Sequence, residues 1–153
     1  MKTKTVVLTI SLVFVSVALG FQNNPQLGTW KLNDAKSKFT GKAKNQTVVY
    51  EAAGDQTKVT VDGVDDNGAA VHNEWTGKFD GKDYPLTGDA TADARSYRMI
   101  NKNTMALTVK KDGKATVTGR IVVSSDGKSR TVTTTATDAQ GKKVTNVAVY
   151  DKQ

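Results

Sequence analysis

The stretch from Asp112 to Gln153, DGKATVTGRIVVSSDGKSRTVTTTATDAQGKKVTNVAVYDKQ, decides the fold of this chain. Turn signals recur in it at an even interval, at Asp112-Gly113-Lys114, Asp126-Gly127-Lys128 and Gln140-Gly141-Lys142. Asp-Gly supplies the positive φ angles of a type I′ hairpin, so each signal predicts a reversal between antiparallel strands. The segments between the signals are rich in Thr and Val and lack Pro. Strands as long as these segments between turns must twist and coil, which favours a barrel wall over a small sandwich.

The same alternation of apolar and polar residues extends upstream. Strands are expected within 28–33, 47–53, 58–62, 71–79, 83–87, 95–100 and 104–110, with Pro85 confining its short strand to an edge or a bend. Residues 34–44 are predicted to form a basic loop with at most one helical turn, opened by Asn33 or Asp34. The chain is therefore predicted to be all-β, an antiparallel up-and-down barrel of about eight to ten strands, whose closure removes the exposed sheet edges.

The first twenty residues differ in composition from the rest of the chain. Lys2 and Lys4 precede an apolar run over 6–19, which ends in the small residues Ala18 and Gly20. This pattern predicts a secretory signal peptide at 1–20, cleaved after Gly20 or Ala18, and a single barrel domain at 21–153. An uncleaved membrane anchor is the alternative, although the run is short for a bilayer span. We expect a secreted or periplasmic protein.

Charge and cysteine content exclude several classes of function. The formal net charge is +7, which stays positive without Lys2 and Lys4 and supports solubility and weak affinity for anionic surfaces. The absence of cysteine excludes disulfides, thiol catalysis and thiolate metal sites. The lysines of the basic loop are Lys36, Lys38, Lys42 and Lys44. They are either solvated or in weak contact with anionic envelope surfaces. Only Phe39 is nearby for base stacking, so we expect no nucleic-acid partner. We also expect that the protein binds no cofactor and that it is a monomer.

Two short motifs carry a family resemblance. The Gly28-Thr29-Trp30 triplet at the start of the first expected strand resembles the calycin superfamily of lipocalins and fatty-acid-binding proteins. The ending Val147-Ala148-Val149-Tyr150-Asp151-Lys152-Gln153 resembles the last strand of the fatty-acid-binding branch. The strand plan is also similar to that of small lipocalin-like proteins that bacteria export. The resemblance implies a barrel with an interior ligand site.

The chain departs from the fatty-acid-binding branch in two places. That branch has a helix pair after its first strand, for which residues 34–45 are too few. It also holds the ligand carboxylate with an Arg-x-Tyr pair on the last strand, where this chain has Ala148 and Tyr150. Ala148 cannot donate the paired hydrogen bonds of a guanidinium. From the lipocalin branch, the resemblance implies that an arginine packs over Trp30 and closes one barrel end; Arg130 is the best match and Arg120 the second.

Apolar and aromatic residues at inward positions either line a ligand cavity or simply fill the core. We predict that they contact a ligand; they are Trp30, Tyr50, Trp75, Phe79, Tyr97, Met99, Leu107, Ile121 and Tyr150. The inward face of the strand that contains Tyr50 is undecided. Either Val48 and Tyr50 or Thr47 and Val49 point into the barrel. The favoured function is an exported lipocalin-like barrel that binds a small apolar or amphipathic ligand. The alternative is a filled barrel that acts as an envelope structural or interaction module.

Evidence for catalysis or metal binding is weak. His72 and Glu74 share a strand face and are the one pair suited to acid–base chemistry, but Thr76 and Lys78 on that face indicate a solvated outer wall. The segment 63–74 resembles a calcium loop, yet Gly63 stands at its first ligand position. We therefore expect neither an enzyme nor a metal site.

Overall fold

The structure is a computed structural model that describes residues 24–138 and 140–153. The predicted signal peptide, 1–20, lies outside these residues. The strands are β1 (Gly28–Leu32), β2 (Lys44–Ala53), β3 (Gln56–Val64), β4 (Ala70–Gly77), β5 (Tyr84–Thr87), β6 (Ala94–Asn101), β7 (Thr104–Lys111), β8 (Lys114–Val123), β9 (Ser129–Thr137) and β10 (Lys143–Lys152). A 3₁₀ turn, η1 (Asp34–Lys36), follows β1, and the Asn33 side chain caps it, as expected.

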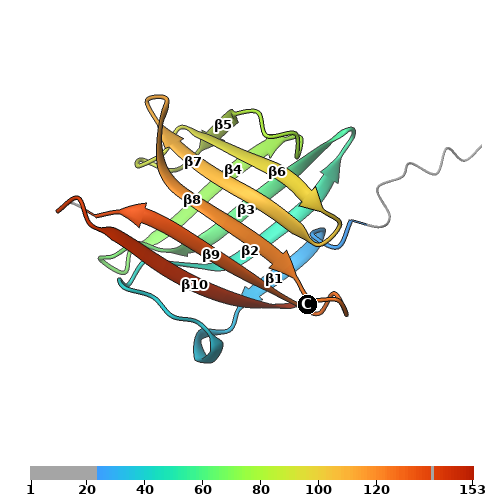
Figure 1. Cartoon of the computed structure of the whole chain (residues 1–153), viewed down its shortest axis with the longest axis horizontal. Coiled ribbons are helices and arrows are strands. Elements are labelled where there is room, and N and C mark those ends of the chain that lie inside the picture. The colour runs from blue at the N-terminus through green and yellow to red at the C-terminus, as the bar shows by residue number, and fades with distance from the viewer. Residues whose placement is uncertain (1–23, 139) are drawn as a thin grey trace, which may run out of the picture.

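The ten strands form one closed antiparallel barrel, which confirms the predicted fold class. Every strand pairs with its neighbours in sequence, and β1 closes the barrel by pairing with both β2 and β10. Figure 1 shows β6 to β10 in front of β2 to β4, with η1 beyond the lower end of the wall. Closure leaves no long unpaired strand edge among the described residues.

The turns lie at the predicted positions, but one of them is not of the predicted type. Asp112 and Gly113 both have positive φ, 49° and 74°, as a type I′ turn requires. At the next turn Gly127 has positive φ but Asp126 does not, so the prediction of type I′ is wrong there. The reason is a longer loop, in which the Asp126 carboxylate accepts hydrogen bonds from the Ser124 hydroxyl and the Lys128 amide.

Helical structure is limited to η1 among the described residues, so the loop after β1 holds no helix pair. No described helix is long and apolar enough to cross a membrane.

The inward face of most strands matches the period-two pattern, whereas on β6 the consecutive residues Arg95, Ser96 and Tyr97 are all buried. Val48 and Tyr50 are buried, which decides the open question at β2, and Trp75 and Ala148 are buried on β4 and β10. The hairpins β2–β3, β6–β7 and β8–β9 lie at one end of the barrel, which Trp30 and the segment 24–27 cover. The loop 37–43 and the hairpins β3–β4, β7–β8 and β9–β10 surround the other end. We call these the covered end and the loop end.

Gly88, between β5 and β6, offers a matched test of backbone packing. Gly88 and Gly113 have similar positive φ, 82° and 74°, which Asn tolerates. A Cβ at Gly88 would collide with the carbonyl oxygen of His72, whereas nothing lies within 4 Å of one at Gly113. We expect Gly88→Asn to lower the free energy of unfolding by about 2–3 kcal/mol and Gly113→Asn by less than about 0.5 kcal/mol. Urea denaturation measures both, and equal losses would contradict this packing.

Candidate ligand cavity

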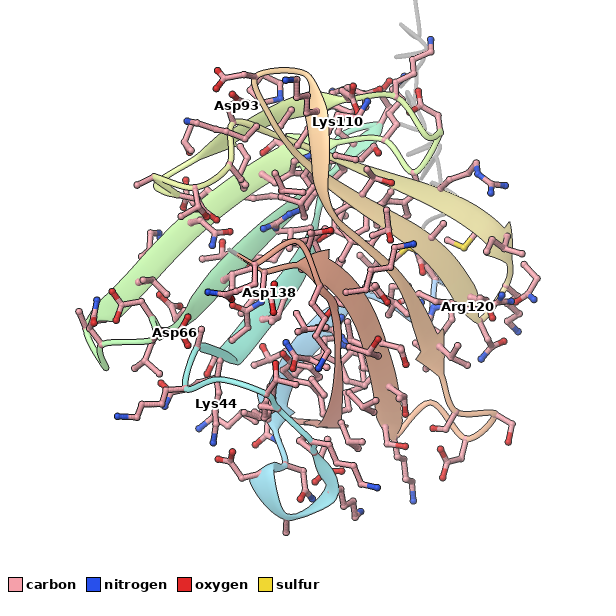
Figure 2. All side chains as sticks on the ribbon, turned by 60° about the vertical axis from the view of Figure 1, so that its left-hand side comes forward. Lys44, Asp66, Asp93, Lys110, Arg120 and Asp138 are labelled. Carbon is pink, nitrogen blue, oxygen red and sulfur yellow. The ribbon has the colours of Figure 1, made fainter. Side chains whose placement is uncertain are left out.

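The barrel interior holds a cavity of about 660 Å³. This is within the range of about 300–1,000 Å³ that is typical of small-molecule sites. Exposed residues of the loop end border it, among them Asp66, Ala90 and Thr116, and it extends inward to Tyr150 and Arg130. Figure 2 shows Lys44 and Asp66, which both border the cavity, at this end. The interior is therefore not filled by side chains.

The predicted ligand contacts fall into two groups. The first group lines the cavity and consists of Tyr50, Tyr97, Leu107, Ile121 and Tyr150. The second group is buried or half-buried without lining it and consists of Trp30, Trp75, Phe79 and Met99. Both groups face inward, so the strand pattern could not separate them. The strand register does not separate them either, because Tyr50 pairs with Gly28 and so lies nearer the covered end than Val48, the partner of Trp30. A ligand role for the first group stays a prediction.

Aromatic rings fill the interior beside the cavity. Trp75 meets Tyr97 edge to face with ring centroids 4.8 Å apart, and it stacks on Phe79 at 6.3 Å. The Trp75 indole N–H donates to the backbone carbonyl of Arg95 at 2.8 Å. Edge-to-face pairs of this kind add stability beyond simple burial. The cluster fixes the position of Tyr97 on the cavity wall.

Arg130 lies on β9 at the inner limit of the cavity, among three aromatic rings. Its guanidinium carbon is 4.9 Å from the Trp30 ring centroid, 4.8 Å from that of Tyr50 and 4.9 Å from that of Tyr150. These are cation–π distances. The structure thus places the best-matching arginine over Trp30, while the second match, Arg120, is exposed on the outer wall of β8. Trp30 itself is fully buried, and its indole N–H donates to the Gln26 carbonyl at 2.8 Å.

Arg95 on β6 is an interior residue that the sequence analysis did not identify as a site. Its side chain is 6% exposed and lines the cavity. Nη2 donates to Asn73 Oδ1 at 3.2 Å, and Nη1 donates to the Tyr97 hydroxyl at 3.5 Å. The sequence did contain a signal for the inward position of Arg95, because this residue precedes Tyr97 by two positions and so shares its strand face. Arginine is usually exposed, which hides it from a search for apolar inward residues.

The interior carries positive charge without a buried acid among the described residues. Arg95 and Arg130 are the buried charged side chains, and neither forms an ion pair. Tyr50 and Tyr150 do not supply a phenolate in compensation. Burial raises the pKa of Tyr150 to about 12, and burial followed by repulsion from Tyr97 raises the pKa of Tyr50 well above its usual range. Both hydroxyls therefore stay neutral, and the Tyr150 hydroxyl donates to the Asn45 carbonyl at 2.9 Å.

His72 and Glu74 lie on the outer wall, as their strand face predicted. Their side chains are 56% and 42% exposed, and His72 also borders the cavity at the loop end. His72 Nδ1 is 2.6 Å from Asp62, its Nε2 is 3.7 Å from Glu74, and Glu74 pairs with Lys58 at 2.8 Å. Within the described residues no group of three or more His, Asp or Glu side chains is arranged to hold a metal ion.

This outer cluster predicts a pH-dependent term in stability. The hydrogen bond that His72 Nδ1 donates to the Asp62 carboxylate raises the pKa of His72 above its ordinary value. Protonation of His72 therefore stabilises the folded state, fully below about pH 6.5, and this stabilisation is lost as the pH rises through the raised pKa. We expect His72→Gln to lower the urea midpoint more at about pH 5.5 than at about pH 8.5. Asp62→Asn should reduce the same pH dependence. Equal effects of His72→Gln at both pH values would contradict the assignment.

Two loop features of the sequence are occupied by contacts within the protein. At the calcium-like segment, the Asp65 carboxylate accepts hydrogen bonds from the Asn67 and Ala69 amides and so closes the β3–β4 turn. In the basic loop, Lys44 pairs with Asp34 at 2.5 Å and Lys36 lies 3.9 Å from Asp151. These contacts use part of the charge of the basic loop.

No family model matches the chain, and no curated protein matches it. Among solved structures, a redesigned β-barrel, mFAP1, bound to DFHBI is similar at 14% identity and a TM-score of 0.47, covering 85% of this chain and 99% of that one. The structure of EF1p2_mFAP2b bound to DFHBI is similar at 10% identity and a TM-score of 0.48, covering 84% and 94%. The fold assignment accordingly rests on the strand order and register described above.

Proposed function

We propose that this chain is an exported lipocalin-like barrel that binds one small apolar or amphipathic molecule in its interior. The observation that carries the proposal is the cavity of about 660 Å³, which is open at the loop end. Leu107, Ile121 and Ala148 provide apolar wall, so burial would supply most of the binding free energy. Tyr97 adds a hydroxyl that can orient a ligand.

Export is supported by the sequence alone, through the charged and then apolar segment at 1–20. A binding role rather than catalysis fits the outer position of His72 and Glu74, the pair best suited to acid–base chemistry by sequence. We further propose that the protein acts as a monomer in the envelope of a bacterium or outside it. Edman sequencing of the mature protein from its own host tests export, which predicts a first residue at 19 or 21.

Ligand binding is tested by two measurements on the full mature protein. Mass spectrometry after gentle purification from the native host should detect a co-purifying small molecule. Titration with Nile red, a neutral apolar dye, should give saturable fluorescence at one site per chain, with quenching of tryptophan. No co-purifying molecule together with no saturable signal would contradict the proposal and favour an interaction module that works through its outer wall.

A further inference from the structure

Arg95 is a buried cation whose hydrogen-bonding capacity is only partly used. Its Nε–H has no partner, and its longest contact, Nη1 to the Tyr97 hydroxyl, measures 3.5 Å. Asn73 contributes one neutral acceptor, at 3.2 Å from Nη2. A guanidinium carries five N–H donors, so most of those on Arg95 remain available. These donors belong to a side chain that lines the cavity.

The acids nearest along the cavity wall do not balance this charge. Asp65, Asp66 and Asp89 border the cavity at the loop end, and each accepts hydrogen bonds from loop residues at that end. The Asp66 carboxylate accepts hydrogen bonds from the Lys42 and Ala43 amides at 2.9 and 3.0 Å. The Asp89 carboxylate accepts them from the amide and hydroxyl of Thr91. None of the ion pairs among the described residues includes Arg95.

Arg95 also lacks the aromatic contacts that stabilise Arg130. Three ring centroids lie within 4.9 Å of the Arg130 guanidinium, whereas no cation–π contact involves Arg95 in the described part of the chain. A buried charge without a counterion is costly to fold. Apolar side chains of similar length would be expected at such a position if it served packing alone. The position is therefore better explained by a ligand than by stability.

We propose that Arg95, with Asn73 and Tyr97, forms an anion subsite that binds the carboxylate head group of an amphipathic ligand. The N–H groups of Nη1 and Nη2 that Tyr97 and Asn73 leave free suit the two oxygens of a carboxylate. The apolar tail then lies along Leu107, Ile121 and Ala148. The head group is held from β4 and β6, and not from β10, where Ala148 offers no donor. This inference rests on the proposed ligand-binding function.

The test compares two probes that differ only in charge, dansyl-labelled undecanoic acid and its methyl ester. The wild-type protein should bind the acid about tenfold more tightly than the ester, which corresponds to one charge-assisted hydrogen-bond pair. Arg95→Met should remove this preference while leaving ester binding within about twofold. Arg120→Met is the matched control, because Arg120 lies on the outer wall of β8 and carries the same charge (Figure 2). It should keep the full preference for the acid.

A second readout separates a ligand role from a structural one. Replacing an unpaired buried charge by an apolar side chain is often neutral or stabilising. Without ligand, Arg95→Met should therefore unfold at a urea concentration equal to or higher than that of the wild type. If Arg95→Met does not fold, Arg95→Gln, which keeps a donor toward Asn73, replaces it and should also lose the preference.

The outcomes distinguish the two proposals. If the wild type binds neither probe, the proposed ligand-binding function fails. If it binds both probes equally, or if the folded Arg95 variant still prefers the acid, the function survives and the anion subsite is overturned. A clear loss of stability in both Arg95→Met and Arg95→Gln, with acid and ester weakened alike, would assign Arg95 to packing and also overturn the subsite.

Discussion

Trp30→Ala should lower the free energy of unfolding by about 3–5 kcal/mol, the usual cost of deleting a buried tryptophan. Trp30 is fully buried between β2 and β10, in the strand that closes the barrel. Its loss removes one of three rings around Arg130 and the hydrogen bond to the Gln26 carbonyl, which fixes the segment over the covered end. Since small domains are stable by only about 5–15 kcal/mol, the effect is large. Urea denaturation of wild type and variant measures it.

Trp30→Phe is the matched control for this prediction. It keeps an aromatic face beside Arg130 and loses the indole donor, so we expect a smaller loss of about 1–3 kcal/mol. A double-mutant cycle with Arg130→Met isolates the ring–guanidinium term, expected at about 0.5–2 kcal/mol. If Trp30→Ala lowered the free energy of unfolding by less than about 1 kcal/mol, the packing of Arg130 on Trp30 would not close this end of the barrel.

Filling the cavity should abolish ligand binding and leave the fold intact. Leu107 on β7 and Ala148 on β10 both line the cavity. In the double variant Leu107→Trp with Ala148→Trp, two indoles occupy the space of a ligand tail. If about 120 Å² of apolar ligand surface can no longer be buried, affinity for Nile red falls by about 3 kcal/mol, which is more than a hundredfold. Fluorescence titration measures this loss.

The control for the cavity experiment is Val122→Trp. Val122 is 40% exposed on β8, so the added indole stays outside the barrel. It should leave dye affinity within about twofold of the wild type. Circular dichroism and urea denaturation establish that the filled variant remains folded. Unchanged dye affinity in a folded, filled variant would place the dye site outside the interior and contradict the proposed function.

The two ends of the barrel divide stability and binding between them. At the covered end Trp30 and the three-ring environment of Arg130 stabilise closure. Toward the loop end the wall is less filled, and Arg95 lies buried there without an ionic partner. The same residue type therefore lies among aromatic rings in one place and beside the polar side chains of Asn73 and Tyr97 in the other. That contrast makes the variants at Trp30 and Arg95 separate tests of stability and of binding.

Local sequence alone determined the strands, their turns and their faces. Asp-Gly and Asn-Gly signals set the hairpins, and the period of two placed Trp75 inside and His72 outside, because both properties depend on neighbouring residues. The turn type predicted at Asp126 is wrong, since the loop there depends on a side-chain hydrogen bond from Ser124 to Asp126.

Only the tertiary structure decided which inward residues border open space. Trp30 and Tyr50 follow the same strand pattern, yet only Tyr50 lines the cavity, because the surroundings of each ring depend on side chains that barrel closure brings together from different strands. Closure also brings Arg95 of β6 to Asn73 of β4, although β5 lies between these strands. A contact between residues far apart in the sequence has no local signature. The sequence therefore determined the strands of the barrel wall. The closure of the barrel determined which inward residues border the cavity.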